Sequence, residues 1–143
     1  MNLFFGVAGP SANERSIRAR RYLQEEWKVT PDLVAVSGQL VLGWINDGGS
    51  VLGVAQADGR TCLLLGSIFG QAGEPSASLI GEPQQAAAWL LSRFETMGDR
   101  FLDGVTGNYT VAVLDQAAGR LLFASDPGGG RRLFMASAGK DGL

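Results

Sequence analysis

The 143-residue chain contains no histidine and a single cysteine, Cys62. The missing histidine excludes a Ser-His or Cys-His nucleophile pair, a histidine general base and a zinc site built with histidine. One cysteine can form neither an internal disulfide nor a thiolate cluster for zinc or iron–sulfur. Chemistry on this chain would therefore need carboxylates, a backbone amine or a bound cofactor, and no metal site is expected. The lone cysteine agrees with a reducing, cytoplasmic compartment.

Long apolar runs and a strong net charge are also absent. No run approaches the roughly 20 residues of a membrane span, and the N-terminus lacks the basic segment and cleavage site of a signal peptide. The net charge of −2 gives no electrostatic reason to expect nucleic acid or an anionic membrane as a partner. The length and an apolar content of 45% instead indicate one globular domain over residues 1–143.

Apolar runs separated by turn residues predict a mostly β domain with two helices. Residues 11–14 (SANE) match a capping box at the start of the first helix, and Pro83 and Gly98 bracket the second. Gly38 and Gly43 are expected to bend a long apolar segment into one or two strands. The expected helices are 12–27 and 83–97, and the expected strands are 3–8, 33–45, 50–56, 60–69, 108–115, 120–125 and 132–136.

Residues 126–132 (DPGGGRR) form a glycine-rich segment between two predicted strands. The backbone N–H groups of Gly128, Gly129 and Gly130, with Arg131 and Arg132 beside them, could hold an anion or another ligand. The segment does not open a helix, so it is neither a P-loop nor a dinucleotide motif. A plain connection is the favoured interpretation.

The other polar or reactive residues have simpler interpretations. The arginines of the first helix are largely offset by glutamates on the same helix, which indicates a solvated surface. Cys62 lies in the apolar segment CLLLG and is expected to be an inert core residue. Asp103, Asp115 and Asp126 lie at strand or turn boundaries, where stabilising turns is favoured over acid–base chemistry. Residues 139–143 are mostly turn residues, which favours the hypothesis that the chain is a fragment of a longer protein.

Two segments in the second half resemble class II glutamine amidotransferase domains. Residues 101–115 (FLDGVTGNYTVAVLD) and 120–134 (RLLFASDPGGGRRLF) are similar, in order and spacing, to LxGxFAFALWD and LLLARDxxGxRPLYY. Residues 65–70 (LGSIFG) are similar to the NGEIYN segment of these domains, and residues 5–9 (FGVAG) to their CGIAG start. The chain thus resembles the N-terminal domain of the group that contains asparagine synthases, β-lactam synthetases and lasso-peptide cyclases.

This resemblance implies an α+β fold of the Ntn-hydrolase type, a four-layer αββα sandwich of two antiparallel sheets with flanking helices. It also implies that a C-terminal ATP-dependent synthetase domain follows in the same protein. That domain would be the main partner, and it alone would bind ATP and Mg²⁺. No cofactor is expected in residues 1–143, and a homodimer is the other assembly that the resemblance suggests.

Three positions depart from the family pattern. Family glutaminases attack glutamine with an N-terminal cysteine, but the matching residue here is Phe5, which has no nucleophilic group and follows four other residues. The oxyanion-stabilising asparagine corresponds to Leu65, and the glutamate that binds the substrate's amino group corresponds to Ser67. The resemblance with these departures predicts a catalytically inactive domain, with a structural or substrate-access role in a parent ligase that forms amide bonds.

Two alternatives stay open. The chain could be a stand-alone module on the same fold that binds a peptide or an anion, through the emptied pocket or residues 128–132. It could also be an amidohydrolase with another nucleophile such as Ser11, although Ser11 fits better as the N-cap of the first helix.

Overall fold

The computed structural model describes residues 2–36, 39–46, 51–71, 82–128 and 134. In this part the chain is an α+β protein with two antiparallel sheets and two α-helices. A short 3₁₀ helix, Gly98–Arg100, directly follows the second α-helix. The elements in chain order are β1 (Leu3–Ala8), α1 (Ala12–Glu26), β2 (Asp32–Val36), β3 (Leu40–Ile45), β4 (Leu52–Ala57), β5 (Arg60–Gln71), α2 (Pro83–Met97), β6 (Val105–Asp115) and β7 (Arg120–Ser125).

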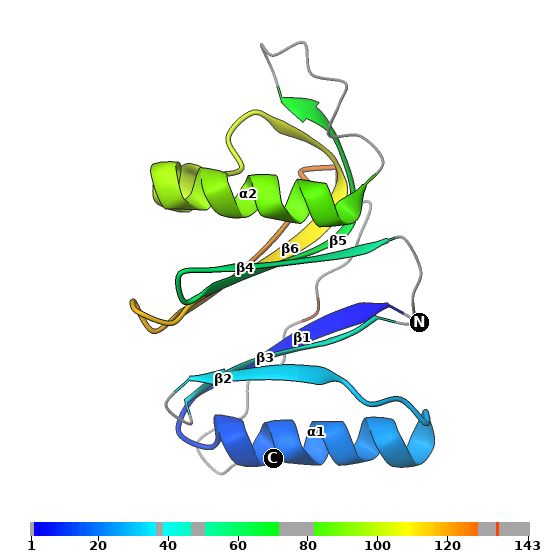
Figure 1. Cartoon of the computed structure of the whole chain (residues 1–143). Coiled ribbons are helices and arrows are strands. Elements are labelled where there is room, and N and C mark those ends of the chain that lie inside the picture. Colours follow the sequence, from blue (N-terminus) through cyan, green and yellow to red (C-terminus); the bar gives the residue numbers. More distant parts are fainter. Residues whose placement is uncertain (1, 37–38, 47–50, 72–81, 129–133, 135–143) are drawn as a thin grey trace.

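The elements stack as four layers. One sheet has the strand order β1-β3-β2, and the other has the order β4-β5-β6-β7. The two sheets face each other, α1 covers the outer face of the first sheet, and α2 covers the outer face of the second (Figure 1). This arrangement is compatible with the layer order helix–sheet–sheet–helix that the family resemblance implies.

Apolar side chains from both sheets fill the space between them. Leu42 and Trp44 of β3 pack with Leu63 of β5 and Leu114 of β6. At one side of this layer the rings of Phe4 and Phe123 stack with their centroids 5.9 Å apart. Glycine at position 6 permits this approach, because a Cβ there would lie 2.6 Å from Leu121 Cδ2 and would overlap the Phe123 ring.

Helix α2 forms because its apolar residues recur at helical spacing and its ends are well defined. Pro83 occupies its first turn, and Gly98 ends it with a φ of +60°, a conformation that favours glycine. Its buried residues are Pro83, Ala86, Ala87, Leu90, Leu91 and Phe94. They pack against the outer side chains of the four-stranded sheet, which include Cys62, Leu64 and Val111.

Helix α1 is held more lightly on the three-stranded sheet. It buries only Ala12, Ser16 and Leu23, and leaves Ile17 and Tyr22 more than half exposed. No helix in the described ranges is both long enough and apolar enough to cross a membrane.

Several sequence predictions need correction. The capping box is wrong, because the side chain of Ser11 forms no cap hydrogen bond; only its carbonyl accepts the Arg15 N–H. Gly43 is not a bend but a central residue of β3, paired with Phe5 and Leu33. The strand expected over 108–115 begins at Val105, and that over 60–69 continues to Gln71. Gly38 and most of the expected strand 132–136 lie outside the described residues.

Candidate functional site

Phe5, at the position of the family nucleophile, is a packing residue of β1. It pairs with Gly43 of β3, which in turn pairs with Leu33 of β2. Residues directly opposite each other in antiparallel strands place their side chains on the same face. A Cβ on Gly43 would overlap the Phe5 ring and lie 2.7 Å from Leu33 Cδ2. The Phe5 ring therefore covers Gly43, between β1 and β2.

That face of the three-stranded sheet is turned away from the other sheet. The neighbours of Gly43 along β3, Leu42 and Trp44, are the residues that pack against the four-stranded sheet. Because side chains alternate along a strand, Gly43 and Phe5 lie on the opposite face, toward α1. The side chain at position 5 thus points toward the α1 layer and not into the space between the sheets.

Leu65 and Ser67 lie together on β5 of the other sheet. Leu65 packs against the apolar layer between the sheets, beside Leu63. Ser67 is two residues further along the same strand, so it shares that inner face, and it is exposed. The structure therefore brings Leu65 and Ser67 onto one surface but places Phe5 on a different sheet and on the outer face of that sheet.

The inner face near Ser67 carries a group of polar residues that sequence reasoning missed. Ser67 pairs with Asn108 of β6, and the next row on the same face is Leu65, Thr110 and Ser125. Ser67, Asn108 and Ser125 are exposed, whereas Thr110 is only 4% exposed. The alternating polar residues at the start of β6 (TGNYT) could have indicated this face from the sequence. We call Ser67, Asn108, Thr110 and Ser125 the inner polar face.

Asp126 fixes the start of the glycine-rich segment. Its backbone N–H donates to Tyr109 O at 3.0 Å, and its Oδ1 accepts the Tyr109 N–H at 3.3 Å. Burial, and secondarily the charge of Asp126, raise the pKa of the Tyr109 hydroxyl. A Cβ on Gly128 would lie 3.1 Å from Asp126 Oδ2. The first glycine of the segment thus lies beside a carboxylate, which opposes an anion; residues 129–132 are outside the described part.

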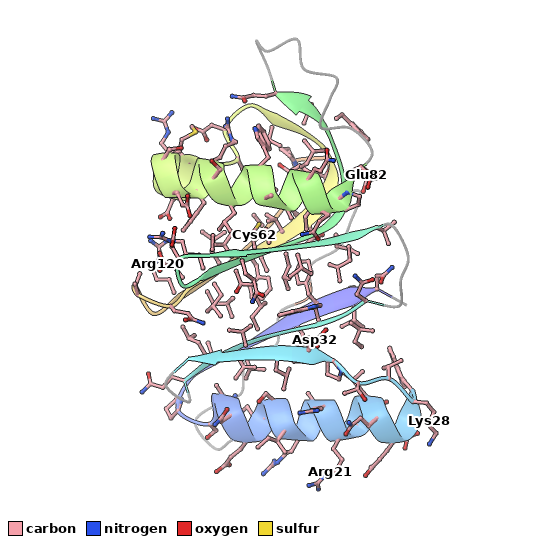
Figure 2. The ribbon with its side chains drawn as sticks, viewed as in Figure 1. Arg21, Lys28, Asp32, Cys62, Glu82 and Arg120 are labelled. Carbon is pink, nitrogen blue, oxygen red and sulfur yellow. The ribbon has the colours of Figure 1, made fainter. Side chains whose placement is uncertain are left out.

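The remaining candidates have the structural roles that the sequence favours over functional ones. Cys62 is fully buried beneath α2 (Figure 2), and burial raises the pKa of its thiol to about 12, which makes it unreactive. Arg21 on α1 points away from the sheets. Asp103 accepts from Arg100 at 2.8 Å, and Asp115 accepts the Ala118 N–H at 3.2 Å within the turn before β7.

Metal ligands do not gather in the described residues, where no group of three cysteine or carboxylate residues could hold an ion. Ser11, the nucleophile of the alternative amidohydrolase, is half-buried at the start of α1. Comparison of the chain with known protein families, with curated proteins and with solved structures found no match.

Proposed function

We propose that this chain is a catalytically inactive glutaminase-like domain of the Ntn-hydrolase type, belonging to an asparagine-synthetase-like ligase that forms amide bonds with ATP. Two features support the proposal. Residues 101–134 resemble the second half of such domains, and the four layers have the helix–sheet–sheet–helix order that the resemblance implies. In this role the domain covers the synthetase domain and shapes access of its substrate, while ATP and Mg²⁺ bind in the synthetase domain alone.

The orientation of Phe5 is the observation that best supports a catalytically inactive domain. Acyl transfer from glutamine needs a nucleophile and an oxyanion donor that converge on one carbon atom. Here Phe5 and Leu65 offer neither group, and their side chains lie on different sheets, with Phe5 facing α1. A structural role accounts for both residues, because each contributes apolar contact to its own layer.

A glutaminase assay tests this proposal directly. The purified chain is incubated with L-glutamine, and glutamate is measured by a coupled dehydrogenase reaction. We expect release at the level of the buffer blank, beside an active class II amidotransferase as the positive control. Robust release by the purified chain would overturn the proposal.

The ligase role has its own test, independent of glutamine hydrolysis. If the domain serves a synthetase, the reading frame that encodes it should continue into an SGGxDS segment of the ATP-pyrophosphatase type. The ATP-dependent activity of that longer protein should fall when residues 1–143 are removed. Full activity of the synthetase domain alone would contradict the structural role.

The alternative, a stand-alone binding module, has two forms, one that binds an anion and one that binds a peptide. The carboxylate of Asp126 beside Gly128 opposes the anion form of this alternative. The exposed members of the inner polar face, Ser67, Asn108 and Ser125, are uncharged and favour a neutral ligand such as a peptide.

A further inference from the structure

Helix α1 carries charged side chains of both signs that do not pair with one another. They are, in chain order, Glu14, Arg15, Arg18, Arg20, Arg21, Glu25 and Glu26. Among the described residues, none of these side chains forms an ion pair or a hydrogen bond. The described arginines outside α1 all have partners, and these are Arg60, Arg93, Arg100 and Arg120. The unpaired charges are therefore concentrated on the outer layer that α1 forms (Figure 1).

The two signs of charge are separated along the helix. The arginines lie within residues 15–21, whereas Glu25 and Glu26 lie in the last turn, which contains no basic residue. The C-terminal end of a helix has a partial negative charge, so carboxylates there are unfavourable unless cations approach them. In an antiparallel pair of such helices, the basic part of each would lie over the acidic end of the other. Helix α1 is thus complementary in charge to a second copy of itself.

Three exposed residues define where two copies would meet. Arg18, Tyr22 and Glu25 follow the spacing i, i+4, i+7, so they lie on one strip of the helix surface. Tyr22 is 56% exposed, which is unusual for a large aromatic side chain on a helix that covers a sheet. Beside the strip, Arg21 points away from the sheets (Figure 2). With a two-fold axis next to Tyr22, Arg18 of each copy lies opposite Glu25 of the other.

The same strip favours a second copy over a polyanion. Glu14 and Glu25 lie on it with Arg18, since residues 14, 18 and 25 also recur at helical spacing. Carboxylates at these positions would repel nucleic acid or an anionic membrane, whereas a partner with both signs of charge satisfies them together with the arginines. The second copy supplies both signs in the required order.

We propose that α1 docks antiparallel on α1 of a second copy of this chain, through Arg18–Glu25 pairs on both sides of Tyr22. One helix from each copy makes a small interface, and exposed ion pairs each contribute little, so the dimer is weak and forms at high protein concentration. The proposal goes beyond the role in a ligase, because it depends on α1 alone.

Sedimentation equilibrium of the purified chain tests the proposal. The protein is measured at several concentrations in about 0.01 M and about 1 M salt, between which the screening length falls from about 30 Å to about 3 Å. We expect a dimer that grows with concentration at low salt and a monomer at high salt. A monomer at every concentration in low salt would overturn the proposal. A dimer whose dissociation constant is the same at both salt concentrations would also overturn it.

Charge reversal locates the interface. Arg18→Glu and Glu25→Arg each place like charges opposite one another, so each should raise the dissociation constant about tenfold. Mixed in equal amounts, the two variants should associate again, because every reversed side chain then meets one of opposite sign in the other variant. Glu95→Arg on α2 is the matched control, since Glu95 is an exposed helix carboxylate with no ion pair among the described residues. It should leave the dissociation constant unchanged.

Failure of the mixture to associate, with both variants folded by circular dichroism, would overturn the antiparallel pairing. Equal association of the two α1 variants and the Glu95→Arg control would place the interface elsewhere and would overturn the proposal as well. The glutaminase assay has a separate readout, so failure of this interface and failure of the proposed function are distinguishable.

Discussion

Asp115, the last residue of β6, is held by two partners from different parts of the chain. Its Oδ2 accepts from Arg60 Nε, and its Oδ1 accepts the Ala118 N–H, both at 3.2 Å. Burial by itself would raise the pKa of this carboxyl. The hydrogen bond from Ala118 and the guanidinium of Arg60 outweigh burial and lower the pKa below its ordinary value. The charged carboxylate therefore stabilises the turn and the β5–β6 pair.

This gives a prediction about pH. Because the folded state holds the Asp115 pKa low, its contribution is fully present above the ordinary aspartate range and is lost as the pH falls through the folded pKa. At pH 7, Asp115→Asn should lower the free energy of unfolding by about 1 kcal/mol. The gap from the wild type should shrink in acid, as urea denaturation at pH 7 and near pH 3 can show. A gap that stays constant with pH would contradict the charge argument.

Single residues differ in how far the sequence foretells their role. The inert character of Cys62 and the turn role of Asp115 follow from neighbours in sequence, an apolar run in one case and a turn in the other. The direction of the Phe5 ring depends on which residue of β3 lies opposite it. The burial of Thr110 between Leu65 and Ser125, with no hydrogen-bond partner for its hydroxyl among the described residues, depends on which strands pair. Pairing between strands that are distant in the sequence determines both features, and the hydrophobic pattern alone does not predict that pairing.

At the scale of elements, the contact between α2 and β4 shows how an edge strand is protected. The Gln84 side chain accepts the Val54 N–H at 3.0 Å and donates to Val54 O, so it satisfies both backbone groups of Val54 on β4, the edge strand of the sheet in the described residues. Unpaired edge groups would otherwise invite another chain to pair. Element bounds were predictable here because Asp58-Gly59 and Pro83 mark them locally. The hydrogen bonds between Gln84 and Val54 span 30 residues and were not predictable from the sequence.

Gln84→Ala should expose this edge. We expect a loss of about 1 kcal/mol in the free energy of unfolding, together with more self-association at high concentration, since Val54 regains free backbone groups. Gln85→Ala is the matched control, as Gln85 is an exposed neighbour on the same helix with no such bond among the described residues. Chemical denaturation and light scattering measure the two effects. Equal behaviour of the two variants would show that the edge needs no protection.

Gly53 sets the distance between the same two elements. A Cβ there would overlap the carbonyl of Pro83 and lie 2.9 Å from Gln84 N, so α2 would have to move. Gly53→Ala should therefore cost about 1–3 kcal/mol, the usual range for overpacking. Gly70→Ala on β5 serves as the control, because nothing lies within 4 Å of a Cβ at that position. Thermal unfolding of both variants compares the costs; a similar small loss in each would mean that α2 shifts without strain.

At the scale of the whole molecule, the two helical layers contribute unequally. Helix α2 buries six residues on the four-stranded sheet, whereas α1 buries three on the other sheet, one of them the polar Ser16. A domain of β-strands with two helices was predictable, because both helices have apolar residues at helical spacing and Pro83 and Gly98 mark the ends of α2. The division of the strands between two sheets was not, since it depends on long-range pairing. The sheet on which Phe5 lies is therefore the less firmly covered one.

This architecture predicts that restoring the family residues will not restore catalysis. A variant that lacks residues 1–4 and carries Phe5→Cys, Leu65→Asn and Ser67→Glu would contain a free cysteine amine, an amide donor and a carboxylate. We still expect glutamate release at the blank level. Position 5 faces α1, while positions 65 and 67 face the space between the sheets, so the thiolate could not meet a carbonyl held by the other two.

The same triple variant with residues 1–4 retained is the control for the loss of the Phe4–Phe123 stack. Circular dichroism should first establish that each protein is folded. Measurable turnover by a folded, trimmed variant would show that β1 can turn its side chain inward, and the orientation of Phe5 would then not explain the inactivity.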